Sequence, residues 1–450
     1  MNLSSIIESL DQKILNDPSL DSSRFAELVE LQRELGLLHG QRPTCPFLRP
    51  HIVTHEQYSA IAEAATVIAR AMEKMVAKAL EDGSLAKRLG LTEVELQMAR
   101  VDPGYSTLCV TSRLDAYLSE SGFQFLEYNA ESPAGVGDQM QLEKLLLPLD
   151  HNQDLLREYQ CWKPEPHREL LVALLNAYRE WGGDEEHPNI AIVDWEKVAT
   201  ESEFHVLGKY FESCGHQTTI VDPCRLRIHD NRLWADDFRV DIVYKRVIIH
   251  EFLERLGQNH PLATSYANGM VCMANSFRSK VAHKKAGFAI LTDPDYSYFF
   301  SARERDVVST HVPWTRVFEQ GRTRFESSEY DLVSLARAER QRMVLKPNDD
   351  YGGHGVFIGW LMNEPEWEQA ITLALERPYV IQERVPVKKI SIPMFTDKVS
   401  RQEMFVDFNP FLFANKVEGA LIRLSSSALL NVTSGGGQTA LLVLAEKHAN

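Results

Sequence analysis

The hydrophobic periodicity of the chain changes twice along its length, and these changes limit the folds it can adopt. Up to about residue 104, apolar residues recur at helical spacing, in one segment ending at Gly40 and in a longer one ending at Gly83. Over 187–250, strand-like and helix-like patterns alternate, and beyond about 275 strand-like segments dominate. The sequence therefore predicts a fold of α/β plus α+β character with a helical N-terminal region.

The alternating segment predicts a small Rossmann-like unit. It contains strand-like runs such as "NIAIVDW" and "VDIVYKRV", a helical pattern in "ESEFHVLGKYFESCG", and a hairpin around Asp230 and Asn231. It lacks the glycine fingerprint GxGxxG, so no dinucleotide is implied. The predicted units are 1–104, 187–274, and a discontinuous region made of 105–186 and 275–450.

Bulk properties exclude several classes of function. A chain of 450 residues is expected to form two or three structural units, and its net charge of −15 argues against a nucleic-acid partner. There is no apolar run long enough to cross a membrane, and the N-terminus does not resemble a signal peptide. The six cysteines never form a CxxC pair, which indicates reduced thiols. We expect a cytoplasmic protein without nucleic-acid or membrane partners, and a homodimer remains open.

The stretch "VLKPNDDYGGHGVFIG" places Lys346 at the end of an apolar strand, before two aspartates and a glycine cluster. Glycine allows backbone N–H groups to approach phosphates closely, and a lysine supplies a counter-charge. The stretch does not match the GxxxxGK[ST] loop. Two alternatives follow from these residues: a tight surface hairpin, or a loop that closes over phosphates.

The segment "TSRLDAYLSESGFQFLEYNAES" places polar residues two apart on two successive strands. Arg113 and Asp115 would share one face of the first strand, and Glu127 and Asn129 one face of the second. Carboxylate and amide oxygens are ligands that suit Mg²⁺. The alternative is a solvated strand face with an Arg–Asp surface pair.

A third segment, "GALIRLSSSALLNVTSGGGQTALLVL", places Arg423 in an apolar strand before a triple glycine, residues 435–437. An arginine facing such a loop can hold a carboxylate through two hydrogen bonds. The alternative is a flexible turn near the C-terminus.

The order R-x-D, E-x-N and K-P-x-x-D-x-G-G resembles the circularly permuted ATP-grasp ligases. "RLD" followed by "EYNAES" is similar to the magnesium motif of the glutathionylspermidine synthetase-like family. "VLKPNDDYGGHGV" and "LIRLSSSALLNVTSGGG" are similar to the glycine-rich lid and the second glycine loop of eukaryotic-type glutathione synthetases. The resemblance runs from about residue 105 to the C-terminus. It implies a circularly permuted ATP-grasp fold in which the Rossmann-like unit is the pre-ATP-grasp unit.

The resemblance implies a role for each matching residue. Asp115, Glu127 and Asn129 would hold Mg²⁺, with Asp350 as a further acidic ligand, and Arg113 would neutralise charge at an acyl phosphate. The cofactors implied are ATP and Mg²⁺, with two ions.

Other residues are implied to contact nucleotide or substrate. The implied nucleotide contacts are Lys346; Lys280 or Lys284, with Lys280 preferred; Gly352, Gly353 and Gly355 of the lid; Gln382, Glu383, Arg384 and Val385 of the adenine pocket; and Asp407 at the ribose. The implied substrate contacts are Ser132, Arg423, Gly435 and Gly436.

The implied function is an ATP- and Mg²⁺-dependent carboxylate–amine ligase, with small-molecule or peptide carboxylate and amine substrates. Two alternatives remain: a non-catalytic nucleotide-binding protein and an ATP-grasp phosphotransferase. The residues "PAGVGDQ" depart from the part of the motif that reads glutathione, so neither glutathione nor a polyamine is identified as the substrate. The first 100 residues hold only Cys45, so no amidase domain is expected.

Some polar residues are interpreted without a catalytic role. His354 is expected to be a loop residue, and Lys245 and Arg246 a salt-bridged or solvated pair. The histidines show neither HxxH nor HExxH spacing, so no zinc site is predicted, and no nucleophile signature is present.

Overall fold

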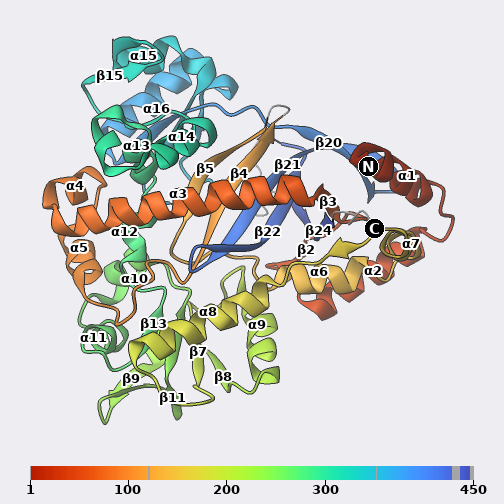
Figure 1. The fold of residues 1–450 in the computed structure, drawn as a ribbon, viewed down its shortest axis with the longest axis horizontal. Coiled ribbons are helices and arrows are strands. Elements are labelled where there is room, and N and C mark those ends of the chain that lie inside the picture. The colour runs from red at the N-terminus through yellow and green to blue at the C-terminus, as the bar shows by residue number, and fades with distance from the viewer. Residues whose placement is uncertain (1, 120–121, 351, 428–435, 446–450) are drawn as a thin grey trace.

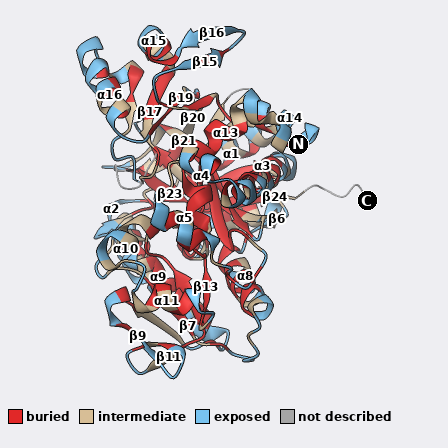
Figure 2. Ribbon diagram, turned by 90° about the vertical axis from the view of Figure 1, so that its left-hand side faces the viewer, coloured by how far each residue is buried: buried red, intermediate tan, exposed pale blue. Residues whose placement is uncertain are grey.

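The computed structural model describes residues 2–119, 122–350, 352–427 and 436–445. In Figure 1 the long helix α3 (His55–Glu81) crosses a central sheet, with one group of helices and strands above it and another below. Buried residues fill the sheets, and the outer helices and hairpins are exposed (Figure 2). The predicted mixture of helices and sheets is confirmed.

The N-terminal region is mostly helical, as predicted, but two helix ends differ from the prediction. The first helical segment ends at Leu35 instead of Gly40, because Gly36 adopts a left-handed conformation with φ of 74°. The long helix ends at Glu81, just before the predicted Gly83. The remaining helices of this region are α1 (Leu3–Leu15), α2 (Ser22–Leu35), α4 (Gly83–Arg88) and α5 (Glu93–Arg100).

This region also contains strands, which the helical prediction missed. β1 (Leu38–His39) and β2 (Arg42–Pro43) pair with each other. β3 (His51–Thr54) pairs in parallel with β24 (Leu441–Leu444), which also pairs with β6 (Cys161–Trp162). The pairing of β3 with β24 joins the N-terminal region to the far end of the chain.

The central sheet has the strand order β23-β22-β21-β4-β5, with β20 paired to β21, and all of these neighbours are antiparallel. Its strands are β4 (Thr111–Ser119), β5 (Gly122–Asn129), β20 (Lys389–Phe395), β21 (Val399–Phe413), β22 (Lys416–Ser425) and β23 (Gly437–Thr439). The apolar side of α3 packs against β21 and β22, so helix and sheet share one core.

Below the central sheet lies the alternating segment, which forms a parallel sheet of order β13-β12-β7-β8. Its strands are short apolar runs buried by helices, as is typical of parallel sheets. The predicted hairpin is present, with positive φ at Asp230 and Asn231. The elements are α8 (Pro166–Trp181), β7 (Ile190–Val193), α9 (Glu201–Ser213), β8 (Thr218–Val221), β9 (Leu226–His229), β10 (Arg232–Ala235), β11 (Phe238–Val240), β12 (Ile242–Lys245), α10 (Ile249–Leu256), α11 (Pro261–Ala267) and β13 (Cys272–Ala274).

Above the central sheet lies an antiparallel sheet of order β14-β19-β17-β18. β17 pairs with β18 through Leu345 and Phe357, and nine residues separate the two strands, more than the tight hairpin considered as an alternative would contain. The elements are α13 (Ala286–Thr292), α14 (Ala302–His311), β14 (Thr315–Val317), β15 (Arg322–Phe325), β16 (Ser328–Asp331), α15 (Leu332–Ala338), β17 (Met343–Pro347), β18 (Phe357–Ile358), α16 (Glu364–Glu376) and β19 (Tyr379–Glu383).

Three further helices connect these layers: α6 (Asp138–Leu146), α7 (Asp150–Glu158) and α12 (Ser279–His283). Across the described ranges, none of the helices combines the length and apolar character that a membrane span requires.

Candidate active site

The β4–β5 hairpin brings four polar side chains to one face of the central sheet. Arg113 is the cross-strand partner of Asn129, and Asp115 is the partner of Glu127. The Asn129 amide nitrogen lies 3.0 Å from an oxygen of Asp115 and 3.4 Å from one of Glu127. The pairing predicted from the two-residue spacing is therefore present.

Asp115 is surrounded by donors. Arg113 donates to both of its oxygens, at 2.7 and 3.1 Å, and Arg423 donates to one of them at 2.8 Å. Together with the amide of Asn129, these bonds fill the four acceptor sites of a carboxylate. Burial opposes ionisation, but the two guanidinium groups outweigh it and lower the pKa of Asp115 to about 2. The alternative of a solvated surface pair is wrong, because both partners are buried.

Arg423 on β22 joins this group to Asp407 on β21. Its side chain donates to Asp407 at 2.6 and 2.9 Å. Asp407 is fully buried, and that burial raises its pKa to about 6 although Arg423 opposes the shift. Asp407 does not line the cavity described below, so its predicted ribose contact stays a prediction.

β17 and the loop after it also contribute residues to the cavity described below. Lys346 donates to the side-chain oxygen of Gln382 at 2.7 Å. Burial lowers the pKa of Lys346 to about 8, although Glu127 opposes the shift. Of the lid glycines, Gly352 and Gly353 line the cavity and Gly355 does not. Gly355 has a φ of 67°, and a Cβ there would lie 2.9 Å from Pro347.

The lysines around α12 divide into two groups. Lys280 and Lys284, predicted as alternatives for a phosphate contact, both bind Asp349 at 2.6 Å and do not line the cavity. Lys285, which the sequence reasoning missed, does line it, with its amine 3.5 Å from Glu127. The sequence "HKKA" shows the two lysines side by side, but Lys284 and Lys285 lie between α12 and α13, so a helical pattern does not give their directions.

The predicted adenine-pocket residues lie on and just after β19, outside the cavity lining. Gln382 and Val385 are buried. Glu383 binds Arg342 at 2.6 Å, and the guanidinium of Arg384 lies over the ring of Trp360. Their nucleotide contacts stay a prediction.

A cavity of about 700 Å³ lies between the hairpin, the loop after β17 and the parallel sheet. The predicted site residues that line it are Arg113, Asp115, Glu127, Asn129, Ser132, Lys346, Asp350, Gly352, Gly353 and Arg423. The cavity therefore brings together residues far apart in sequence from all three motifs.

The second glycine loop is only partly described. Gly436 accepts a hydrogen bond from Arg42 at 2.9 Å through its main-chain oxygen, and Gly437 begins β23. Gly435 lies outside the described residues. Ser132 donates to the main-chain oxygen of Arg246 at 2.8 Å and lines the cavity.

The other end of the cavity lies at the carboxyl ends of β7 and β12, where open α/β sheets bind ligands. Its titratable residues were missed by the sequence reasoning. Burial and the neighbouring Glu203 raise the pKa of Asp138 to about 7, and burial raises that of Asp194 to about 6. Arg246 lies 3.6 Å from Glu203 and opposes both shifts.

Arg246 and Lys245 do not form a solvated pair, which corrects that alternative. Both are buried, because β12 lies inside its sheet. Lys245 donates to the main-chain oxygen of Val247 at 3.1 Å, and burial lowers its pKa to about 8. Arg246 lines the cavity, with its guanidinium over the rings of Tyr244 and Phe204.

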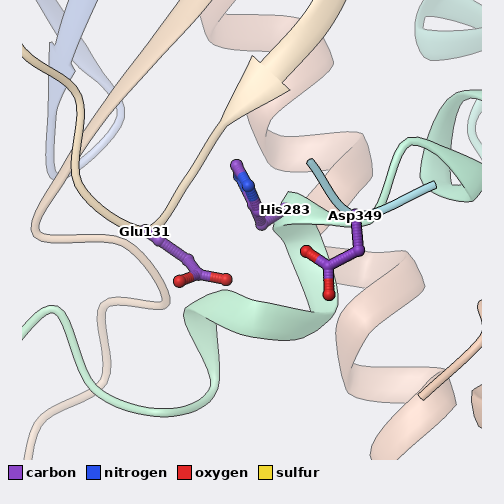
Figure 3. A group of neighbouring side chains, drawn as sticks. All are labelled: Glu131, His283 and Asp349. Atoms are coloured by element: carbon purple, nitrogen blue, oxygen red, sulfur yellow. The ribbon is translucent and has the colours of Figure 1, made fainter. Parts of the chain in front are cut away.

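A second polar cluster lies behind the loop after β17. Figure 3 shows Glu131 after β5, His283 at the end of α12 and Asp349 after β17 as neighbouring side chains. Each has a possible ligand atom within 4.8 Å of those of the other two. The amine of Lys280 lies 2.9 Å from Glu131 and 2.6 Å from Asp349. A lysine ammonium thus already supplies the positive charge that a metal ion would bring to this cluster.

No protein-family model matches the sequence, and no curated protein sequence matches it. Among solved structures, a glutathione synthetase-like effector from Globodera pallida in its apo form is similar, with a TM-score of 0.61 and 13% identity over 96% of this chain and 99% of the effector. A putative γ-glutamylcysteine synthetase from Methylobacillus flagellatus has a TM-score of 0.43 and 11% identity, over 84% and 85% of the two chains. The first similarity shows that this chain has the fold of a glutathione synthetase-like protein.

Proposed function

We propose that the protein is an ATP- and Mg²⁺-dependent carboxylate–amine ligase with a circularly permuted ATP-grasp fold, similar to glutathionylspermidine synthetases without the amidase domain. The observation that carries the proposal is the cavity itself. Its lining combines Glu127, Asn129 and Arg113 with Lys285, Lys346 and glycines of the loop after β17. The fold shared with the glutathione synthetase-like effector supports the same reading.

The donor set fits a magnesium ion, which favours oxygen ligands. Glu127 fits best: its oxygens lie 3.4 and 3.5 Å from Asn129 and Lys285, so they are only weakly engaged. Asn129 can present its oxygen if the amide turns over. Asp115 would have to release one of its four donors to bind a metal ion, whereas Asp350 already lines the cavity. Bound Mg²⁺ would neutralise the negative charge of the ATP phosphates.

In this proposal the cationic side chains position and neutralise anionic groups. Lys346 and Lys285 bind nucleotide phosphates, and Arg113 faces the carboxylate that is activated as an acyl phosphate. An amine then displaces phosphate to form the amide. The loop that carries Gly352 and Gly353 excludes water, which would otherwise hydrolyse the acyl phosphate.

The far end of the cavity is proposed to receive the substrates, small molecules or peptides. Ser132 and Arg246 line this end, and Arg423 lines the cavity at the hairpin end, where it would face a substrate carboxylate. The proposed adenine pocket lies at Gln382, Glu383 and Val385, outside the cavity and next to the Lys346 amine that Gln382 binds.

The first test is nucleotide binding. Calorimetry with Mg²⁺ and a non-hydrolysable ATP analogue should show binding that Glu127→Ala and Lys346→Ala abolish and that the exposed control Lys398→Ala retains. Analogue at a hundred times its Kd should stabilise the wild type by about 2.7 kcal/mol. The absence of any binding at saturating analogue would overturn the proposal.

The second test is turnover with a panel of carboxylate and amine pairs, following ADP release and the mass of the product. A ligase yields ADP, phosphate and an amide. A stable phosphorylated product without an amide would indicate a phosphotransferase instead. Nucleotide binding without turnover on any pair would indicate a non-catalytic nucleotide-binding protein.

A further inference from the structure

Three consecutive residues at the start of the loop after β17 point in three directions. Asn348 is buried in the protein, where its side chain accepts from the Ala286 amide at 2.8 Å and donates to the Leu89 main-chain oxygen at 2.8 Å. Asp349 points toward α12, and Asp350 lines the cavity. The direction of each residue therefore depends on how its neighbours are held.

Asp349 is held by two lysines, one on each oxygen. The amines of Lys280 and Lys284 each lie 2.6 Å from it, and both lysines are buried. Lys280 also binds Glu131 at 2.9 Å, and Lys284 binds Glu95 at 3.1 Å. Each buried ammonium group is therefore shared between Asp349 and at least one further carboxylate, and Asp349 is bound by both lysines.

Asp350, the residue after Asp349, connects this cluster to the candidate active site. The main-chain oxygen of Asp350 accepts a hydrogen bond from Lys285 at 2.7 Å. Lys285 lines the cavity and lies 3.5 Å from Glu127. Lys284 and Lys285 are adjacent, so one binds the aspartate before Asp350 while the other binds Asp350 itself.

We infer that Asp349 is a positioning residue, which fixes Asp350 and Lys285 at the cavity by holding the base of the glycine loop against Lys280 and Lys284. Its carboxylate does not line the cavity and is bound by the two lysines. This inference rests on the proposed function, because the residues that it positions are assigned there to Mg²⁺ and phosphate. It also replaces Lys280 and Lys284 by Lys285 as the phosphate-facing lysine of this segment.

The test compares Asp349→Asn, which keeps the shape of the side chain and removes its charge, with the exposed control Asp397→Asn. Hydrogen exchange over 352–357 should be faster in Asp349→Asn and unchanged in the control. The affinity for the Mg²⁺ complex of a non-hydrolysable ATP analogue should fall about 10- to 100-fold, as is usual for groups that orient ligands. The affinity for the metal-free analogue should fall less, because without Mg²⁺ only the phosphate contact of Lys285 is weakened and Asp350 has no ion to bind. Lys284→Gln, which loosens the same contact from the other partner, should act in the same direction and serves if Asp349→Asn does not fold.

Exchange and Mg²⁺-analogue affinity equal to those of the control, in a folded Asp349→Asn protein, would overturn the inference. Equal losses with and without Mg²⁺ would also overturn it, because they would indicate a general loss of structure. If the wild type binds no nucleotide, the proposed function fails, and faster exchange over 352–357 in Asp349→Asn alone then decides whether the aspartate holds the loop.

Discussion

The two ends of the cavity treat buried carboxylates in opposite ways. At the hairpin end, Asp115 is held by Arg113 and Arg423, and its pKa falls to about 2. At the end formed by the parallel sheet, the pKa values of Asp194 and Asp138 rise to about 6 and about 7. Asp115 thus stays ionised at one end, whereas Asp194 and Asp138 titrate near neutral pH at the other.

The difference comes from the number of cationic partners. Burial raises the pKa of a carboxyl group at both ends, and only nearby positive charge reverses it. The hairpin end has guanidinium groups in direct contact with the carboxylate. The far end has the buried Arg246, which also lies 3.6 Å from Glu203 and is therefore shared. The hairpin end is charge-matched in the free protein, whereas the far end carries excess negative charge.

Removing the arginine that unites the hairpin end should have the largest effect. Arg423→Met leaves Asp407 fully buried without its cationic partner and should lower the free energy of unfolding by about 3–5 kcal/mol. Urea denaturation at pH 7 measures this. The matched control is Arg157→Met, whose exposed pair with Asp154 should contribute less than about 1 kcal/mol. Equal losses in both variants would show that the hairpin end is not charge-matched in this way.

At the far end, a substitution that removes a buried charge should stabilise the protein instead of destabilising it. Asp194 titrates at about 6 when folded and near 3.8 when unfolded, so ionising it destabilises the folded state as the pH rises between these values. Asp194→Asn should therefore stabilise the protein by about 3 kcal/mol at pH 8 and have no effect below pH 4. Urea denaturation across this range measures the difference. A stabilisation that does not change with pH would contradict the assigned cause.

Asp115→Asn tests the same contrast at the hairpin end, where removing the charge should destabilise the protein. The folded pKa of about 2 lies below the unfolded value of 3.8, so this carboxylate contributes stability above pH 4 that is lost as the pH falls toward 2. The variant should lose about 2 kcal/mol at pH 7, and its deficit should shrink below pH 4. The same denaturation series records both variants. Opposite slopes in the two difference curves are expected, and parallel slopes would remove the contrast between the two ends.

The hairpin end could be predicted from the sequence because it depends on local geometry. Arg113 and Asp115, like Glu127 and Asn129, are two residues apart on successive paired strands, and strand alternation places each pair on one face. The spacing does not predict that Arg423 binds Asp115 across the sheet, because this contact depends on the strand order β22-β21-β4.

The far end could not be predicted, because its residues come from elements that only the tertiary fold brings together. Asp194 and Arg246 follow two neighbouring parallel strands, Asp138 begins α6, and Glu203 lies on α9. The strand patterns were visible, but the sequence does not give their neighbours. The strand β3 was missed for the same reason, since its partner β24 lies near the other end of the chain.

The sequence located the lysines of the segment around α12 but not the directions of their side chains, and the nucleotide contact of Lys280 or Lys284 stays a prediction. The helix ends at His283 and the next begins at Ala286, so Lys284 and Lys285 lie between two helices and turn to opposite sides. Lys280 and Lys284 bind the two oxygens of the same aspartate, although only Lys280 lies within the helix. A break between helices is difficult to locate from a short apolar pattern.

The smallest expected effect tests which arginine controls the far end. Arg255 lies over the ring of Trp195 and 3.7 Å from Glu251, and more than half of its side chain is exposed. Arg255→Met should lower the free energy of unfolding by less than about 1 kcal/mol. In this background, Asp194→Asn should stabilise the protein over the same pH range as it does in the wild type. Arg246→Met should instead extend this pH range upward, because Arg246 lowers the pKa of Asp194 and its removal raises that pKa further. If both arginine variants moved it equally, the far end would be governed by its overall charge, and the contrast with the contact-based hairpin end would be one of degree only.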